Sequence, residues 1–162
     1  LDGHTLYGYL PGGASGGILP ASLANVPLDF DTLTPYGCFI GSAAVVVLSN
    51  HDTAVNAARN TMRFFKHESC GQCTPCREGM GWMHRIIDRI VAGDGRPDDI
   101  DQLIRISNAN DGTTICGMGD AAGYATVGII AKYRDEFEYF IANKRSKLDG
   151  RLEVASAEAA HG

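Results

Sequence analysis

The sequence predicts an α+β protein in which a small β-rich segment precedes an all-α bundle of four helices. Two observations lead to this prediction. Short apolar runs separated by Gly and Pro fill residues 1–48, which is the pattern of short strands joined by turns. From residue 51 onward the apolar residues recur every three or four positions instead, which is the period of amphipathic helices.

The β-rich segment, residues 1–48, opens with an alternating strand that contains Tyr7 and Tyr9 and stops at Pro11. Further strands are predicted at residues 18–19, 28–30, 38–40 and 44–48. These strands are too few and too short for an independent sheet. Because the chain also begins with Leu1 rather than Met, it reads as a piece of a longer protein.

The helical domain is predicted to span residues 51–142, followed by a polar, Ala-rich tail at 143–162. The second helix is expected to end at Gly93 or Gly95, and the third to open at Pro97. The apolar positions that define the four helices are, in chain order, Val55, Ala58, Met62 and Phe65; Met80, Met83, Ile87 and Ile90; Ile100, Leu103 and Ile104; and Val127, Ile130, Phe137, Phe140 and Ile141.

Composition excludes several classes of protein. Hydrophobic residues make up 44% of the chain and charged residues 20%, which suits a packed core rather than disorder. The net charge of −5 and the scattered Lys and Arg argue against nucleic-acid binding, and no apolar run is long enough for a membrane span. Five cysteines, an odd number, predict a reduced, cytoplasmic setting rather than a disulfide scaffold.

Four of these cysteines form a pattern typical of metal binding. Cys70, Cys73 and Cys76 have C-x2-C-x2-C spacing, and Cys116 follows after 39 intervening residues. Three close thiolates and one remote thiolate suit a single [4Fe–4S] cluster. Structural zinc is the alternative metal, because four cysteines also satisfy tetrahedral Zn²⁺. The alternative function is a non-redox interaction module, in which zinc or a cluster only stabilises the fold.

Residues beside the cysteine triplet suggest how the helix that follows would support a cluster. Thr74 is the predicted N-cap and Pro75 the first helical residue, so that Cys76 lies in the opening turn near the positive end of the helix dipole. Arg77 either adds positive charge there or is a solvated surface residue. His67 either donates a hydrogen bond to the cluster or is a surface residue at the end of the first helix.

Two further features are predicted to have no cofactor role. Cys38 lies in an apolar segment and is expected to be a small buried side chain. Residues 117–122 match G-x-G-x-x-A, but they lack the preceding strand that a dinucleotide-binding unit requires. No catalytic residue is predicted, since the sequence offers no nucleophile–base or acid–base pair.

At the cysteine motif, residues 68–79 resemble the cluster-binding segment of the NADH-binding flavoprotein subunit family. This family occurs in respiratory complex I, NAD-dependent formate dehydrogenases and NAD-reducing hydrogenases. Residues 10–13, 28–31 and 41–42 resemble the latter part of the family's ubiquitin-like (β-grasp) domain, and residues 51–142 resemble its helical domain. Thr114–Gly117 matches the loop that carries the fourth ligand.

The resemblance implies that Cys70, Cys73, Cys76 and Cys116 bind one [4Fe–4S] cluster. It also implies FMN and NAD sites in an upstream domain absent from this chain, and iron–sulfur subunits as partners. Details at residues 13–20 and 117–122 favour the formate dehydrogenase branch, with complex I and hydrogenase subunits as alternatives. The chain would relay single electrons between flavin and partner clusters, and alone it is predicted to have no NADH activity.

Overall fold

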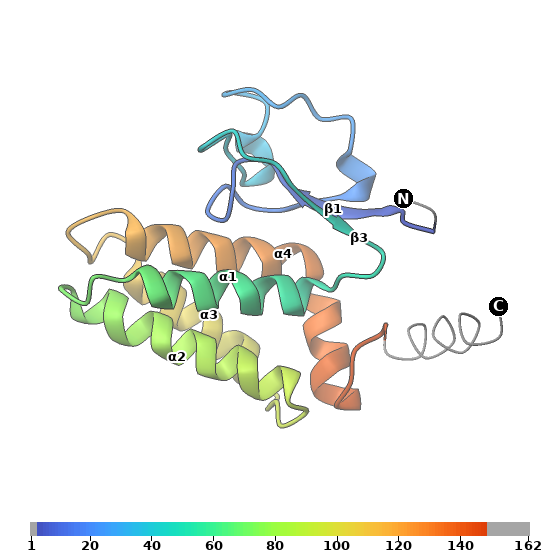
Figure 1. The fold of residues 1–162 in the computed structure, drawn as a ribbon. Helices are drawn as coiled ribbons and strands as arrows, with labels where there is room; N and C mark the ends of the chain where they lie inside the picture. The colour runs from blue at the N-terminus through green and yellow to red at the C-terminus, as the bar shows by residue number, and fades with distance from the viewer. Residues whose placement is uncertain (1–2, 149–162) are drawn as a thin grey trace.

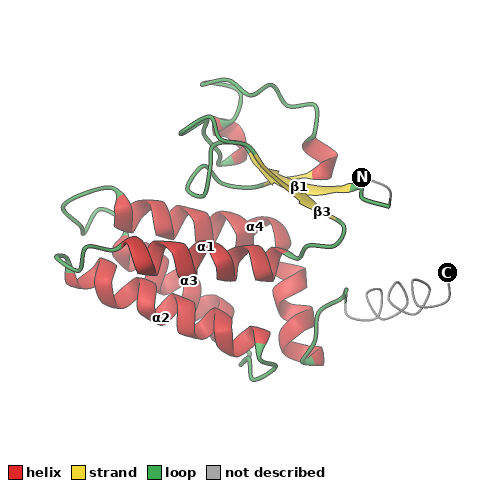
Figure 2. Ribbon diagram, viewed as in Figure 1, coloured by secondary structure: helices red, strands yellow, loops and turns green. Residues whose placement is uncertain are grey.

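The computed structural model describes residues 3–148 of the 162-residue chain. Within these residues, four α-helices form a bundle, and a small antiparallel sheet lies over the side formed by α1 (Ala54–Glu68) and α4 (Met118–Asn143) (Figure 1). The strands belong to the N-terminal part of the chain and the long helices follow them (Figure 2). The α+β prediction is therefore confirmed. The predicted tail falls mostly on residues 149–162, which lie outside the described part.

The sheet has the order β2-β1-β3, with β1 (Leu6–Leu10) between β2 (Leu19–Pro20) and β3 (Val46–Ser49). Both neighbours run antiparallel to β1, and Tyr9 pairs with Leu19 on one side and with Val47 on the other. Tyr9 is buried, and its hydroxyl donates a hydrogen bond to the Leu23 carbonyl at 2.9 Å. Tyr9, Leu19, Leu33 and Cys38 together form a small core separate from that of the bundle.

Two of the predicted strands are wrong, because local hydrogen bonds turn the chain there. At residues 28–30 the Asp29 carboxylate accepts hydrogen bonds from the Asp31 and Thr32 amides, which makes an Asx turn. Residues 38–40 follow a 3₁₀ turn and Gly37, which has φ 66°, and they stay irregular. The predicted strands at 18–19 and 44–48 exist but are displaced, to 19–20 and 46–49.

Of the four helices described, only α1 has a side-chain N-cap, and the boundaries of the others have different causes. α1 starts after Thr53, whose side chain accepts a hydrogen bond from the Asn56 amide at 3.0 Å. α2 (Thr74–Val91) ends just before Gly93, which has φ 82°, so the predicted stop is confirmed. α3 (Asp99–Asn110) begins two residues after the predicted start at Pro97. Its first residue, Asp99, is a buried carboxylate that accepts hydrogen bonds from the Arg89 guanidinium and the Arg96 amide.

The apolar positions that the helical period predicted are buried, except Ile104, Val127 and Ile141, which are partly buried. The bundle core also contains residues that this pattern did not predict, among them Leu10 and Ile18 from the sheet region. α4 is interrupted at Tyr133, which has non-helical dihedral angles (φ −132°, ψ 28°), and the segment after it turns away from the first part (Figure 1). No helix within residues 3–148 combines the length and the apolar character that crossing a membrane requires.

A buried polar contact joins the sheet to the bundle. The Tyr7 hydroxyl on β1 donates a hydrogen bond to Glu136 Oε2 on α4, and the same oxygen accepts one from the Ala54 amide at 3.0 Å. The Tyr7 and Tyr133 rings stack with centroids 5.1 Å apart. Gly8 permits this approach, since a Cβ there would lie 2.5 Å from the Tyr133 hydroxyl. Glu136 thereby caps the first turn of α1 while it holds the sheet in place.

Candidate metal centre

The four predicted ligands lie on two loops at the same end of the bundle. Cys70 and Cys73 belong to the α1–α2 loop, Cys76 to the first turn of α2, and Cys116 to the α3–α4 loop. Figure 1 shows both loops at the left end, because α1 and α3 run toward that end and α2 and α4 lead away from it. The antiparallel order of the helices therefore brings Cys76 and Cys116, which are 40 positions apart, to one end of the bundle.

One hydrogen bond connects the two loops directly. The Ile115 amide donates to Cys73 Sγ across 3.4 Å, and Ile115 immediately precedes Cys116. Cys70 and Cys116 are exposed, Cys73 is half-buried and Cys76 is buried. Two of the four cysteines are therefore at least partly shielded from solvent, and two are exposed. The Ile115 side chain beside them is 83% exposed.

Cys76 has the most ordered surroundings of the four. Its Sγ lies 3.2 Å from Ser69 Oγ and 3.8 Å from Met80 Sδ. Ser69 Oγ also accepts a hydrogen bond from the Gly71 amide at 3.3 Å, in a turn where Gly71 has φ 82°. Since one lone pair of the serine oxygen is used by Gly71, the hydroxyl proton remains available to Cys76 Sγ. The sequence motif contains Ser69, but its spacing alone did not identify this contact.

The helix start differs by one residue from the prediction. Cys73, not Thr74, is the N-cap of α2, and Thr74 and Pro75 occupy its first turn. Cys76 still lies in that turn, so the positive end of the helix dipole faces the cysteine loop as expected. α4 likewise begins at Met118, two residues after Cys116. Both loops therefore lead into helix N-termini, which favour the negative charge of thiolates.

Arg77 and His67 have other partners in the structure. The Arg77 guanidinium donates to the Gly71 carbonyl at 2.7 Å and to Glu78 at 2.9 Å, so it braces the triplet loop. His67 is 86% exposed and lies beside Glu68, which matches the surface alternative. Cys38 is buried, as predicted; its Sγ lies 3.5 Å from the Ile18 carbonyl, and burial raises the pKa of its thiol.

The donor chemistry of the site fits an iron–sulfur cluster. Four thiols on two apposed loops are the soft ligands that such clusters use. A second observation agrees, since Asn110 Nδ2 is the one buried side-chain nitrogen or oxygen within residues 3–148 that lacks a partner. Asn110 ends α3 and packs against Gly79, one turn beyond Cys76, where an additional acceptor would satisfy it.

The structure brings the loops together without a preformed coordination shell. Among the described residues, no three His, Cys, Asp or Glu side chains converge closely enough to hold a metal ion. Residues 117–122 lead into and begin α4, and no described strand precedes them directly, so the dinucleotide match lacks the βαβ setting that it needs. Within residues 3–148, the cysteines are thus the candidates for holding a cofactor at this end of the bundle.

Comparison with known proteins places this helical region in a family. The model of the NADH-ubiquinone oxidoreductase-F iron-sulfur binding region matches residues 56–140. The mitochondrial NADH dehydrogenase [ubiquinone] flavoprotein 1 of Dictyostelium discoideum is 46% identical over 134 residues, covering 82% of this chain and 28% of that protein. A subunit of the NADH-quinone oxidoreductase of Rickettsia typhi is 42% identical over 134 residues, covering 83% of this chain and 32% of the relative.

Solved structures agree with this placement. A chain of the NAD⁺-reducing [NiFe]-hydrogenase in the air-oxidized state has a TM-score of 0.75 and 31% identity, covering 85% of this chain and 24% of that one. The chain therefore spans about a third or less of each of these relatives. The relatives favour the complex I and hydrogenase alternatives over the formate dehydrogenase branch. The chain belongs to the NADH-ubiquinone oxidoreductase-F iron–sulfur binding family, whose cofactor is a [4Fe–4S] cluster.

Proposed function

We propose that Cys70, Cys73, Cys76 and Cys116 hold the [4Fe–4S] cluster, and that the chain is the electron-relay part of an NAD-linked oxidoreductase subunit. The observation that carries this proposal is the apposition of the two cysteine loops through the Ile115–Cys73 hydrogen bond. When bound, the cluster supplies one-electron transfer. The residues of the chain hold it at the bundle end, place two helix N-termini toward it and offer Ser69 as a hydrogen-bond donor.

The larger assembly follows by analogy with the relatives. The first-named relative is a flavoprotein, and the solved relative is an NAD⁺-reducing hydrogenase. We therefore place FMN and NAD in a domain upstream of this chain, and partner iron–sulfur subunits next to the cysteine loops. A complex I-type or hydrogenase-type subunit is the preferred assignment, and a formate dehydrogenase subunit is the remaining variant. The free thiols suit a reducing compartment such as the cytoplasm.

Anaerobic reconstitution with iron and sulfide tests the cofactor. The loaded chain should show a broad visible absorbance that dithionite bleaches, together with an electron paramagnetic resonance signal in the reduced state. Tight binding of zinc with no bleachable absorbance would favour the alternative, in which a metal stabilises the fold of a non-redox interaction module.

A second assay tests whether the chain can oxidise NADH without the upstream flavin domain. Hydride transfer from NADH delivers two electrons, whereas one cluster accepts a single electron, so a flavin must stand between them. The loaded chain should therefore accept electrons from dithionite yet reduce no dye with NADH, even when FMN is added. NADH turnover above the rate of free flavin would contradict the proposal.

A further inference from the structure

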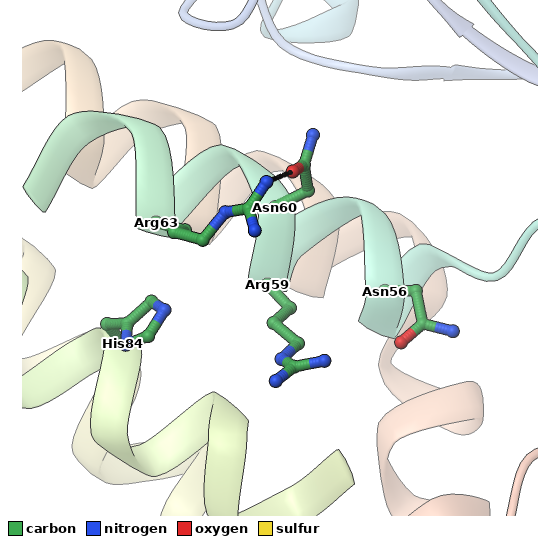
Figure 3. Close-up of a pocket in the computed structure, with 5 residues that line it drawn as sticks. All are labelled: Asn56, Arg59, Asn60, Arg63 and His84. Atoms are coloured by element: carbon green, nitrogen blue, oxygen red, sulfur yellow. Dashed lines mark hydrogen bonds between the residues drawn. The ribbon is translucent and has the colours of Figure 1, made fainter. Parts of the chain in front are cut away.

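A polar hollow lies between α1 and α2, away from the cysteine loops. It has a volume of about 320 Å³ and is lined by Asn56, Arg59, Asn60, Arg63 and His84. Figure 3 shows Arg59 extending from α1 toward α2 and the His84 ring rising from α2 toward α1. The volume is at the lower end of small-molecule sites. The lining differs from most such sites because it contains no aliphatic or aromatic side chain apart from the imidazole.

The charges around this hollow are mainly positive, although the chain as a whole carries −5. Arg59, Arg63 and Lys66 on α1 all lower the pKa of His84, beyond the larger effect of its burial. Asp88 on α2 acts in the opposite direction and raises it. Three cationic side chains and one carboxylate therefore act on His84, and two of the cations, Arg59 and Arg63, line the hollow itself.

The one carboxylate is already bound at the edge of the hollow. Arg59 Nε donates to Asp88 Oδ1 at 2.6 Å, and His84 Nδ1 lies 3.1 Å from Asp88 Oδ2. Arg63 has no carboxylate partner within residues 3–148; it donates to Asn60 Oδ1 at 3.1 Å, as the dashed line in Figure 3 shows. The guanidinium carries five N–H donors, so most of those of Arg63 remain available to an anion.

We infer that this hollow binds the phosphate group of a small, polar phosphorylated molecule. Guanidinium groups bind phosphate oxygens in a forked geometry, and the amides of Asn56 and Asn60 can bind hydroxyl groups on the remainder of the ligand. The lining contains no aliphatic side chain against which an aromatic base could pack. Inorganic phosphate alone would leave much of the hollow unfilled. The expected ligand is therefore a phosphate monoester of the size of glycerol phosphate.

Calorimetric titration of the reconstituted chain with glycerol 3-phosphate, inorganic phosphate and AMP tests this inference. Glycerol 3-phosphate should bind saturably and more tightly than inorganic phosphate, and AMP should bind no more tightly than glycerol 3-phosphate. Arg63→Gln should weaken binding by about tenfold or more, since it removes charged hydrogen bonds. Arg105→Gln, which removes the same charge from an exposed position on α3, should leave binding unchanged.

The His84 side chain provides a second readout, because it is only 12% exposed and borders the hollow. A bound phosphate should raise the pKa of His84, as measured by nuclear magnetic resonance, and the shift should vanish in Arg63→Gln. Three results would overturn the inference: no saturable binding of glycerol 3-phosphate, equal affinity for inorganic phosphate and the ester, or equal loss of binding in Arg63→Gln and Arg105→Gln. Circular dichroism of both variants confirms that they fold.

Discussion

Among the described residues, the helical bundle leaves four large apolar side chains exposed (Phe64, Trp82, Ile115 and Tyr124), whereas the shorter sheet region leaves eight exposed between Leu6 and Val47. Met62, Met80 and Phe137 in the bundle are fully buried, but Phe30 is 82% and Val47 64% exposed in the sheet region. The bundle is thus stabilised by its own core. The sheet region has a small core of its own; it also buries Leu10 and Ile18 in the bundle core and contacts Glu136 of the bundle through Tyr7.

The largest expected effect is loss of the cluster, which a cysteine substitution should cause in the helical region but not in the sheet region. Cys116→Ser should lose the cluster or convert it, because this residue is the thiol proposed as the fourth ligand after the triplet. Cys38→Ser changes a buried thiol of the sheet region and should keep the cluster. Iron and sulfide content after anaerobic reconstitution measures both. If Cys116→Ser kept the cluster and Cys38→Ser lost it, the proposed location of the cluster would be wrong.

Gly12→Ala should unfold the sheet region selectively. A Cβ at Gly12 would lie 2.1 Å from the Phe39 carbonyl oxygen and 2.7 Å from the Ile40 carbonyl carbon, both backbone atoms that cannot rotate away. We expect a loss of about 3 kcal/mol in the free energy of unfolding. Faster hydrogen exchange should be largest in residues 6–49, since most of the bundle core comes from the helices.

A glycine in the bundle is the matched control. A Cβ at Gly81, inside α2, would meet nothing closer than Arg85 at 3.6 Å. Gly81→Ala should therefore stabilise the protein by about 0.5–1 kcal/mol through helix propensity. If Gly12→Ala accelerated exchange equally in the helices, the two regions would be a single cooperative unit.

Alkaline pH should weaken the contact between the regions. Burial, with the nearby Glu136 carboxylate, raises the pKa of Tyr7 far above its usual 10, and burial raises the pKa of Tyr133 to about 12. Above pH 10 the unfolded chain loses these protons while the folded chain keeps them. The unfolded state is then favoured, so stability should fall as the pH rises from about 10. Above pH 10 the denaturant midpoint should fall less steeply with pH in Tyr7→Phe than in the unsubstituted chain. An equally steep fall in both would contradict the role given to Tyr7.

The smallest expected effect is on the reduction potential of the cluster. If Ser69 donates to Cys76 Sγ when this sulfur is a ligand, Ser69→Ala should lower the potential, since hydrogen bonds to ligand sulfur stabilise the reduced state. The expected shift is about 20–60 mV, which corresponds to about 0.5–1.5 kcal/mol in a one-electron couple. A potentiometric titration followed by electron paramagnetic resonance measures it.

Ser107 offers a matched control for that experiment. Its hydroxyl lies 3.2 Å from Met83 Sδ, a sulfur in the bundle core that is not a proposed ligand. Ser107→Ala should change stability but leave the potential unchanged. Equal shifts in the two variants would show that Ser69 acts through general packing rather than through Cys76.

The bundle could be predicted from the sequence because each helix carries a local apolar period and a recognisable stop such as Gly93. The cysteine spacing likewise predicted which thiols share one end. The strands were harder to predict, because the turn at Asp29 depends on side-chain hydrogen bonds that apolar patterning does not report. Contacts between distant residues, such as Tyr7 with Glu136 and Asn110 with Gly79, have no sequence signal at all.

The antiparallel pairing of α2 and α3 has a consequence for how related sites can be found. Their connection at residues 92–98 lies at the opposite end of the bundle from the cysteine loops, about 27 Å away along the 18 residues of α2. Lengthening or shortening that connection changes the number of residues between Cys76 and Cys116 without moving either one. The 39-residue interval therefore reflects two helix lengths and a turn, not a requirement of the metal. A search pattern for this centre should fix the triplet and the loop after α3, and leave the interval between them free.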